Sequence, residues 1–290
     1  MSDFSQKGVR ISPRHALWVL LAFGAVLRLW GLGSKPFWSA EIQEIFGARC
    51  PLFYTNFDDA GSDVLGYAYH FLVWCSGLFP LEFFDRLANA LAGVAAIWVA
   101  YAWGRYAVDR RAGLIAALLT TVSFLMVDIS QTARFYMVCT VAGNGATILL
   151  LEALEKNRLL PTRRLVAVWI LDSIAILSHG GATAFIAAQL FAVCYFCFHQ
   201  EGGGKLGIRN ALRVFVPLIP AVLAQAAALL SFSPKMGAHA DYFMHGTNWN
   251  LDSLAVGLAA VLSGTWLPVL YIFGTMVFVG GAVLWNTQPR

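Results

Sequence analysis

Three short segments carry side chains that can do chemistry, and the first runs from Arg28 to Ile45. Arg28 lies near the end of an apolar run, where a cation is costly unless it reaches lipid headgroups or binds an anion. Glu41 follows a turn of Gly, Ser and Pro, and its carboxylate can act as a general base toward an acceptor hydroxyl. An acid placed at a helix start by the helix dipole is the alternative interpretation.

The second segment is DISQTARFYM, residues 128–137, in which Arg134 is the only cation. A guanidinium beside the phenol of Tyr136 and the amide of Gln131 suits bidentate binding of a phosphate or pyrophosphate at a lipid–water boundary. Arginine and tyrosine also anchor helices at such boundaries without binding a ligand. Both interpretations stay open at this point.

The third segment is ILSHGGATAF, where His179 precedes two glycines that permit close approach of a ligand or a helix. The histidine can donate a hydrogen bond to phosphate or simply complete local packing. Asp172, earlier in the same apolar run, is an intramembrane carboxylate, and such residues have a function or pair with another helix.

Other kinds of site find little support in the sequence. It contains no Walker-type loop, no G-x-G-x-x-G beside a strand and no H-E-x-x-H. Asp58, Asp59 and Asp63 could hold a divalent cation, but solvated loop acids explain them as well, so we predict no metal site. Cys50 and Cys75 fall in one long loop, and their spacing leaves open whether they form a disulfide.

Membrane helices are the elements that must position these residues. The 290-residue chain is 59% hydrophobic and 12% charged, whereas soluble domains carry about 25% charge. This excludes a soluble enzyme, a nucleic-acid-binding protein, a disordered chain and a disulfide scaffold. Because a spanning helix needs about 20 mostly apolar residues, we predict an all-α polytopic membrane bundle, a single domain over 1–290. The expected spans, about eight, are 15–33, 87–107, 112–128, 136–154, 165–178, 181–198, 212–232 and 266–286.

Lysine and arginine gather at alternate ends of these spans, which predicts a cytoplasmic N-terminus. The outer loops are then residues 34–85 and 233–250, where carboxylates, histidines and aromatics concentrate. Within the first outer loop, residues 40–48 and 64–79 are apolar enough to form juxtamembrane helices on the membrane surface.

The order of these segments resembles the class C (GT-C) glycosyltransferases that use polyprenyl-phosphate sugars, including protein mannosyltransferases and the aminoarabinose transferase of lipid A. Their first span ends R-x-x-x-L-G before W-x-D-E, matched here by Arg28, Leu32 and Gly33 and then by residues 38–41. Their motif S-Q-x-A-R-x-Y stands at residues 130–136, and SHGGATAF is similar to a Ser-His segment of the family. The resemblance covers roughly residues 20–200.

Two positions depart from that family pattern. Ala40 stands where the family has its catalytic Asp, and the family's H-P-P-x-Y-Y is eroded at residues 63–67. The departures leave open a second hypothesis, a catalytically inactive accessory or structural subunit of a larger membrane complex. A transporter is the least favoured alternative, because no chain of intramembrane carboxylates is present.

The resemblance implies transfer of a sugar from a polyprenyl-phosphate donor to an acceptor on the outer face of a bacterial inner (plasma) membrane, without a nucleotide cofactor. Its partners would be the lipid-linked sugar, membrane lipid and other membrane proteins, not nucleic acid. Glu41 would be the catalytic carboxylate. The donor phosphate would meet Arg134, Tyr136, His179, Lys35 and Arg28. The acceptor or sugar would contact Trp38, Asp58, Asp59, Asp63 and Tyr67.

Overall fold

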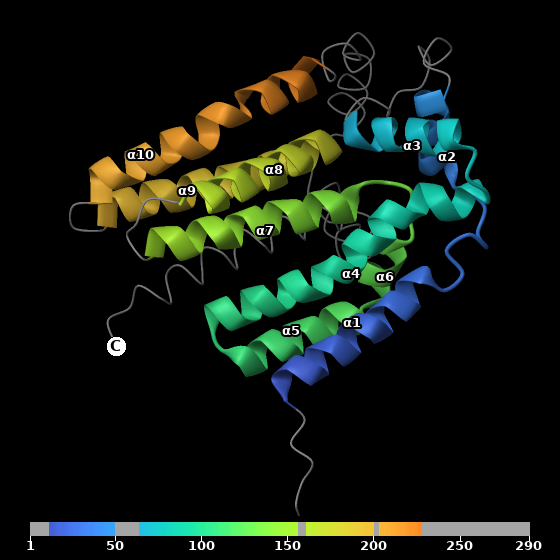
Figure 1. The fold of residues 1–290 in the computed structure, drawn as a ribbon, viewed down its shortest axis with the longest axis horizontal. Coiled ribbons are helices and arrows are strands. Elements are labelled where there is room, and N and C mark those ends of the chain that lie inside the picture. Colours follow the sequence, from blue (N-terminus) through green and yellow to red (C-terminus); the bar gives the residue numbers. More distant parts are fainter. Residues whose placement is uncertain (1–11, 50–63, 156–160, 200–202, 228–290) are drawn as a thin grey trace, which may run out of the picture.

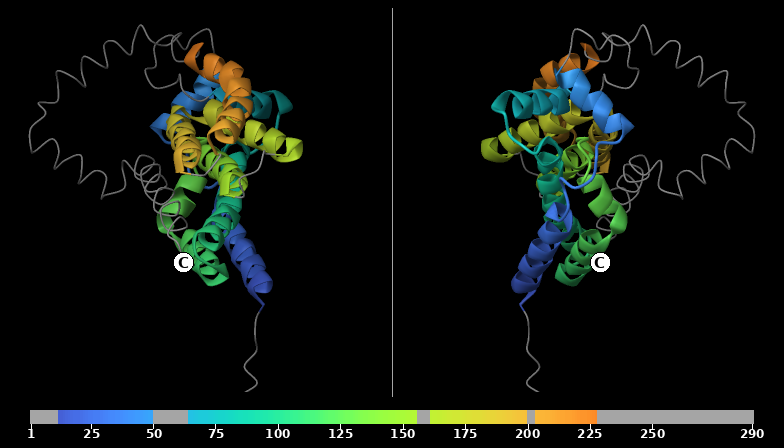
Figure 2. Two further views of the ribbon diagram at one scale, coloured as in Figure 1. Left: turned by 90° about the vertical axis from the view of Figure 1, so that its left-hand side faces the viewer. Right: turned by 90° about the vertical axis from the view of Figure 1, so that its right-hand side faces the viewer.

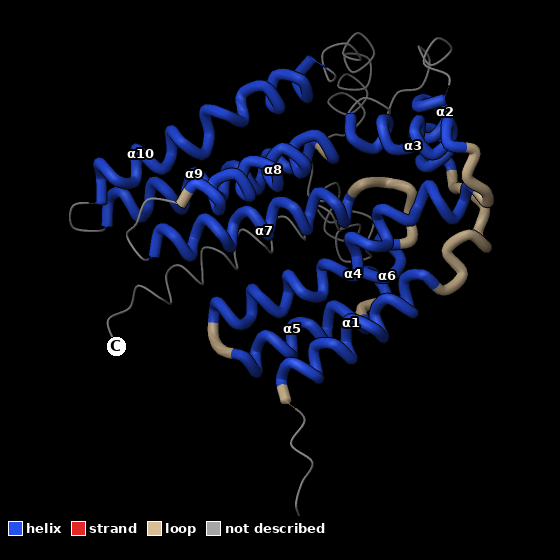
Figure 3. The backbone as a smooth tube through the Cα atoms, in the orientation of Figure 1, coloured by secondary structure: helices blue, strands red, loops and turns tan. Residues whose placement is uncertain are grey.

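The computed structural model describes residues 12–49, 64–155, 161–199 and 203–227. Helices dominate these residues and no strand occurs among them, as Figure 3 shows. The predicted all-α class is therefore confirmed for the described part of the chain. Residues 233–250 and 266–286, expected to be the last outer loop and the last span, lie outside it.

One group of helices consists of α1 (Pro13–Leu29), α4 (Leu81–Ala107) and α5 (Arg110–Val122), which pack against one another. The short helix α6 (Phe124–Ser130) follows α5 after a bend of 62°. Ser123 forms this bend: it ends α5, and its hydroxyl accepts a hydrogen bond from the Met126 N–H at the start of α6. A side chain that caps the second helix in this way stabilises a break in a helical run.

A second group consists of α7 (Tyr136–Glu155), α8 (Thr162–Ser178), α9 (Thr183–His199) and α10 (Gly203–Phe215). Helix α7 packs against α8, α9 and α4, so it joins the two groups (Figure 1). The side views in Figure 2 show the helices of both groups stacked over one another. Short 3₁₀ turns, η3 (Gly180–Ala182) and η4 (Val216–Leu218), connect or follow these helices. The core of this second group of helices is apolar and includes buried Leu150, Leu151, Val168, Val193 and Val214.

The two remaining helices, α2 (Ser39–Arg49) and α3 (Val64–Ser76), pack together at the end of the molecule where α4 begins (Figure 1). They occupy the two stretches predicted to form juxtamembrane helices. Helix α3 leaves Phe71, Leu72 and Trp74 exposed. An apolar exposed face is compatible with contact to lipid, although the position of α2 and α3 on a membrane surface stays a prediction.

Within the described residues, two helices are long and apolar enough to cross a bilayer, Leu81–Ala107 and Tyr136–Leu154. A third candidate exists if the bent pair α5 and α6 is counted as one span. The chain is therefore a helical protein with membrane-spanning potential, but the predicted number of about eight spans is not shown. Helices do form at the predicted positions of α1, α8 and α9, each with 17 residues.

Arg28 is fully buried where α1, α4 and the bend between α5 and α6 meet. Its guanidinium donates to the carbonyl oxygens of Thr120 at 2.8 Å and Thr121 at 3.4 Å, which belong to the last turn of α5. Such carbonyls have no partner within their own helix, and a cation there is also favoured by the helix dipole. Gly93 makes room for this arrangement, because a Cβ atom there would lie 2.1 Å from the Ser130 hydroxyl.

We predict that Arg28→Ala lowers the free energy of unfolding by about 3 kcal/mol, because two buried carbonyls on α5 lose their donor. Thermal unfolding in detergent micelles measures this effect. Arg111→Ala, which removes an exposed arginine from α5, is the matched control and should unfold at the wild-type temperature. Equal unfolding temperatures for both variants would contradict the role assigned to Arg28.

Candidate functional site

Glu41 lies in the first turn of α2 and is completely buried. Arg86 on α4 binds this carboxylate through two nitrogens: Nε donates to Oε1 at 2.9 Å, and Nη2 donates to Oε2 at 2.7 Å. The backbone N–H of Ala133 donates to Oε1 at 2.6 Å, and that of Trp38 donates to Oε2 at 3.1 Å. Each carboxylate oxygen therefore receives two hydrogen bonds, the arrangement of a bidentate ion pair with backbone support.

The same Arg86 guanidinium also fixes the loop between α1 and α2. It donates to the carbonyl oxygens of Leu32, Lys35 and Pro36 at 2.8–3.1 Å and lies 5.0 Å from the centre of the Phe37 ring. The pair of Arg86 and Glu41 thus fastens α4, α2 and two loops together. Because four donors already occupy the Glu41 carboxylate, this geometry favours a positioning role over that of a general base.

His70 on α3 is the centre of a second buried contact. Its Nδ1 lies 3.0 Å from an Asp85 carboxylate oxygen, and its Nε2 lies 2.8 Å from the Ala133 carbonyl oxygen. Both partners can only accept hydrogen bonds, so both ring nitrogens must carry protons and the ring is an imidazolium. Burial alone would lower the pKa of His70, but hydrogen bonds to Asp85 and Glu44 and the negative charge of both carboxylates outweigh it and raise the pKa to about 9.

Three further ionic contacts extend the pair of His70 and Asp85, and the Ala133 backbone, which contacts both Glu41 and His70, links it to the pair of Arg86 and Glu41. Arg49 at the end of α2 pairs with Asp85, Arg134 Nε lies 3.3 Å from a Glu44 oxygen, and His70 Nε2 lies 3.6 Å from the other Glu44 oxygen. We call this group the charge cluster. With His70 protonated, its four cations and three anions sum to +1. Its members are Glu41, Glu44, Arg49, His70, Asp85, Arg86 and Arg134.

Arg134, a member of the charge cluster, forms a row with Tyr136 and His179. The guanidinium carbon of Arg134 is 5.2 Å from the centre of the Tyr136 ring, a cation–π contact. The Tyr136 and His179 rings are 5.0 Å apart in an edge-on arrangement. The sequence placed these residues in two separate segments, and the structure brings them together.

The local structure around His179 decides which of its nitrogens can donate. His179 ends α8, and its Nδ1 accepts a hydrogen bond of 2.9 Å from the backbone N–H of Gly181. The neutral ring therefore carries its proton on Nε2. A guanidinium, a phenol and an imidazole N–H in one row can together donate hydrogen bonds to phosphate oxygens.

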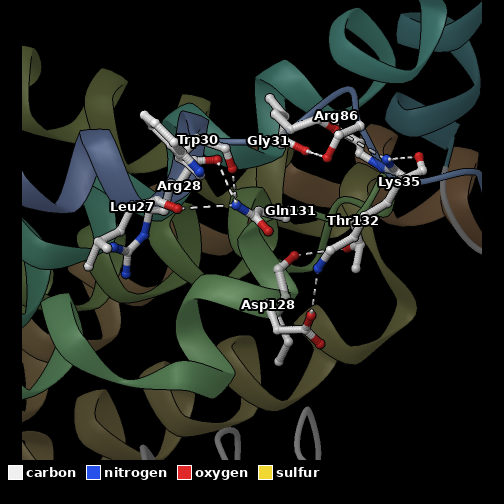
Figure 4. A network of polar contacts seen from close by, with 12 residues as sticks. Leu27, Arg28, Trp30, Gly31, Lys35, Arg86, Asp128, Gln131 and Thr132 are labelled. Carbon is white, nitrogen blue, oxygen red and sulfur yellow. Dashed lines mark hydrogen bonds and ion pairs between the residues drawn. The ribbon is translucent and has the colours of Figure 1, made fainter.

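Lys35 and Arg28, also predicted to bind phosphate, do not join this row. The Lys35 ammonium lies 4.0 Å from Asp128, and both side chains are exposed. Arg28 is occupied by the carbonyls of α5. Gln131, whose amide was expected beside the phosphate, donates instead to the Leu27 and Trp30 carbonyl oxygens (Figure 4).

The predicted sugar and acceptor contacts are only partly visible. Trp38 is half exposed beside Glu41, and Tyr67 lies half-buried on α3. Asp58, Asp59, Asp63 and Cys50 lie outside the described residues, so their roles, including a disulfide with Cys75, stay predictions. In the ranges that the structure describes, no group of three or more His, Cys, Asp or Glu side chains could hold a metal ion.

Sequence reasoning missed the partners inside the charge cluster. Glu44, His70, Asp85 and Arg86 are not among the site residues predicted from the sequence. A usable signal was present, because Asp85 and Arg86 lie in the first turns of a long apolar helix, where ionised groups need partners. Which partners they take depends on contacts between distant segments.

Comparisons of the chain with protein-family models, with curated proteins and with solved structures find no match. The resemblance to class C glycosyltransferases therefore rests on the motifs quoted from the sequence. The contacts of the described residues are the independent information about what the site can do.

We predict that the protein loses stability as the pH rises from about 6.5 to about 9. The folded protein holds the His70 proton up to about pH 9, whereas an unfolded chain releases it near pH 6.5. The stabilisation by this proton is therefore complete below about pH 6.5 and is lost as the pH rises to about 9. The loss should be about 3 kcal/mol, measured by thermal unfolding across this pH range.

His70→Gln should remove most of this pH dependence. His15→Gln is the matched control, because His15 is exposed at the start of α1, and it should keep the wild-type profile. The same profile for wild type and His70→Gln would show that His70 is not protonated as its contacts indicate.

Proposed function

We propose that this chain is a membrane glycosyltransferase of the class C type. It binds a polyprenyl-phosphate sugar beside Arg134, Tyr136 and His179 and transfers the sugar to an acceptor on the outer face of a bacterial inner membrane. The observation that carries the proposal is the row of these three side chains, which two separate sequence motifs had each suggested as phosphate ligands.

The chemistry of this row suits a phosphate leaving group. Arg134 offers a planar set of N–H donors, and His179 offers its Nε2 proton. Glu44 holds the Arg134 guanidinium at 3.3 Å, which fixes its direction before the donor arrives. Donors that are fixed in place stabilise the charge that develops on a departing phosphate, because they need not reorganise during the reaction.

The place of the row along the helices suits a donor carried by lipid. Tyr136 is the first residue of α7, and Asp85 and Arg86 lie in the first turns of α4. Among the described helices, these are the two that are by themselves long and apolar enough to cross a bilayer. If they do so, the charge cluster lies at the boundary of the hydrocarbon core, where a polyprenyl chain enters sideways and its phosphate stays at headgroup level.

The charge of the cluster also favours an anionic ligand. Its cations exceed its anions by one when His70 is protonated. In the described part of the site, Lys35 adds an exposed ammonium at the α1–α2 loop, available to a headgroup or a sugar phosphate. An excess of positive charge in a partly dehydrated site attracts a phosphate more strongly than it would in water.

A second candidate function is a catalytically inactive subunit that keeps the donor site. Two observations favour it: Ala40 replaces the acid expected of the family, and the neighbouring Glu41 carboxylate is fully occupied by Arg86, Trp38 and Ala133. This candidate shares donor binding with the enzyme and differs only in the transfer step. A variant at residue 40 therefore separates the two, whereas a variant at residue 134 tests the donor site that they share.

We predict that Arg134→Ala weakens binding of a polyprenyl monophosphate, added to the protein in nanodiscs, by at least about tenfold, the equivalent of one charge-assisted hydrogen bond. Arg134→Lys keeps the charge but loses the planar fork, so it should fall between wild type and Arg134→Ala. Arg105→Ala, an exposed arginine near the opposite end of α4, is the matched control. Unchanged affinity in a folded Arg134→Ala protein would rule out this donor site.

We further predict that Ala40→Asp raises the rate of sugar transfer, because it restores a carboxylate at the position where the family has its catalytic acid. The rate is measured as release of polyprenyl phosphate from a polyprenyl-phosphate sugar in the presence of membrane acceptors. Ala40→Asn, with the same shape and no charge, is the control and should bring no gain. Intact donor binding with no transfer in wild type or Ala40→Asp would favour the inactive subunit.

A further inference from the structure

Asp172 lies on α8 in the apolar interior where α7, α8 and α9 meet, and it has no role in the proposed function. Its side chain is completely buried, as are those of Gln189 on α9 and Thr147 on α7. Val168 and Ala175, one turn away on either side of Asp172, are also completely buried. A carboxyl group in such surroundings is costly as an anion unless several donors or a cation compensate its charge.

The hydrogen bonds around Asp172 fix the orientation of the Gln189 amide. Gln189 Nε2 donates to Asp172 Oδ1 at 2.8 Å and to Thr147 Oγ1 at 3.2 Å. The Thr147 hydroxyl donates a hydrogen bond to the Gly143 carbonyl oxygen at 2.7 Å, so it can only accept a hydrogen bond from Gln189. Both N–H groups of the Gln189 amide are therefore used, and its oxygen points away from Thr147.

Within the part of the chain that the structure describes, two buried oxygens on this pair receive no hydrogen bond, Asp172 Oδ2 and Gln189 Oε1. The two side chains already share one hydrogen bond, and each of these oxygens belongs to the same carboxyl or amide group as one of the two bonded atoms. A proton on Asp172 Oδ2 supplies a second hydrogen bond: the carboxylic acid O–H can donate to Gln189 Oε1 while Gln189 Nε2 donates back to Oδ1. One proton thus satisfies both oxygens and removes the buried charge.

The charged groups around α8 do not offer another way to compensate an anion. On the helices that contact α8, the described charged side chains are Glu152 on α7, His70 on α3, and Arg209 and Arg213 on α10. Glu152 pairs with Arg164, and His70 pairs with Asp85. On α9 the titratable side chains described are Cys194 and Tyr195. No ion pair within the described residues includes Asp172.

We propose that Asp172 is a proton-binding site, which in the folded protein holds a carboxylic acid paired by two hydrogen bonds to Gln189. This pair links α8 to α9, and the bond from Gln189 to Thr147 extends the link to α7. Polar side chains that are satisfied by one another hold membrane helices together, since lipid offers them no other partner. The proposal is independent of the glycosyltransferase function.

Asp172→Asn tests the proposal most sharply, because an amide has the shape and the donor of the protonated acid and cannot ionise. We expect Asp172→Asn to unfold in detergent no earlier than wild type at pH 6, because the amide does not depend on a proton, and Asp172→Leu to unfold roughly 5 to 10 °C below wild type, because it leaves the Gln189 amide without its partner. Asp172→Asn unfolding as early as Asp172→Leu would overturn the proposal.

Two readouts report on the proton itself. Infrared spectra of the folded wild-type protein at pH 7 should contain the carbonyl band of a buried carboxylic acid, which is absent in Asp172→Asn. Because the folded wild type holds a proton that the unfolded chain releases, its unfolding temperature should also fall relative to Asp172→Asn as the pH rises. Without the band, or with equal pH profiles, the proposal fails.

Replacing potassium by sodium chloride distinguishes a proton from a metal cation bound to the same Asp172 and Gln189 oxygens. If Asp172 holds a proton, replacing potassium by sodium at constant ionic strength leaves the wild-type unfolding temperature unchanged. A sodium-dependent rise that is lost in Asp172→Asn would overturn the proposal in favour of a monovalent cation bound by an ionised carboxylate.

Discussion

Mutual compensation of buried charges is the constraint on which the rest of this structure depends. Arg86 cannot lie within the first turns of an apolar helix unless an anion meets it, and Glu41 on α2 is that anion. His70 and Arg49 compensate Asp85 in the same way. Through these pairs the short helices α2 and α3 are fixed against the beginning of α4.

This constraint also explains the geometry of the candidate phosphate site. The backbone of Ala133 donates to Glu41 and accepts from His70, so the loop before α7 is held at both polar atoms of one residue. The next residue is Arg134, whose direction is therefore set by the fixed Ala133 backbone and by the contact with Glu44. The Glu41 carboxylate, which the sequence suggested as a catalyst, contributes in this structure to the position of Arg134.

The sequence was most informative where a local run or motif of residues determines the structure. Long apolar runs predicted α4 and α7, and the motifs around Arg134 and His179 identified residues that the structure places in contact. Pairing was not predictable, because Arg86 and Glu41 are 45 residues apart and nothing local links them. Arg28 has an apolar context typical of a lipid or phosphate contact, yet a bend in α5 far along the chain offers it carbonyl oxygens.

Photo-crosslinking with a polyprenyl phosphate that carries its reactive group next to the phosphate tests the central claim most directly. Cross-links mapped by mass spectrometry on the protein in nanodiscs should fall in residues 131–137 and around His179, and unlabelled polyprenyl phosphate should compete for them. Cross-links spread along the lipid-exposed helices, or unaffected by the competitor, would contradict the account. The fold held by the charge cluster would then remain without a donor site.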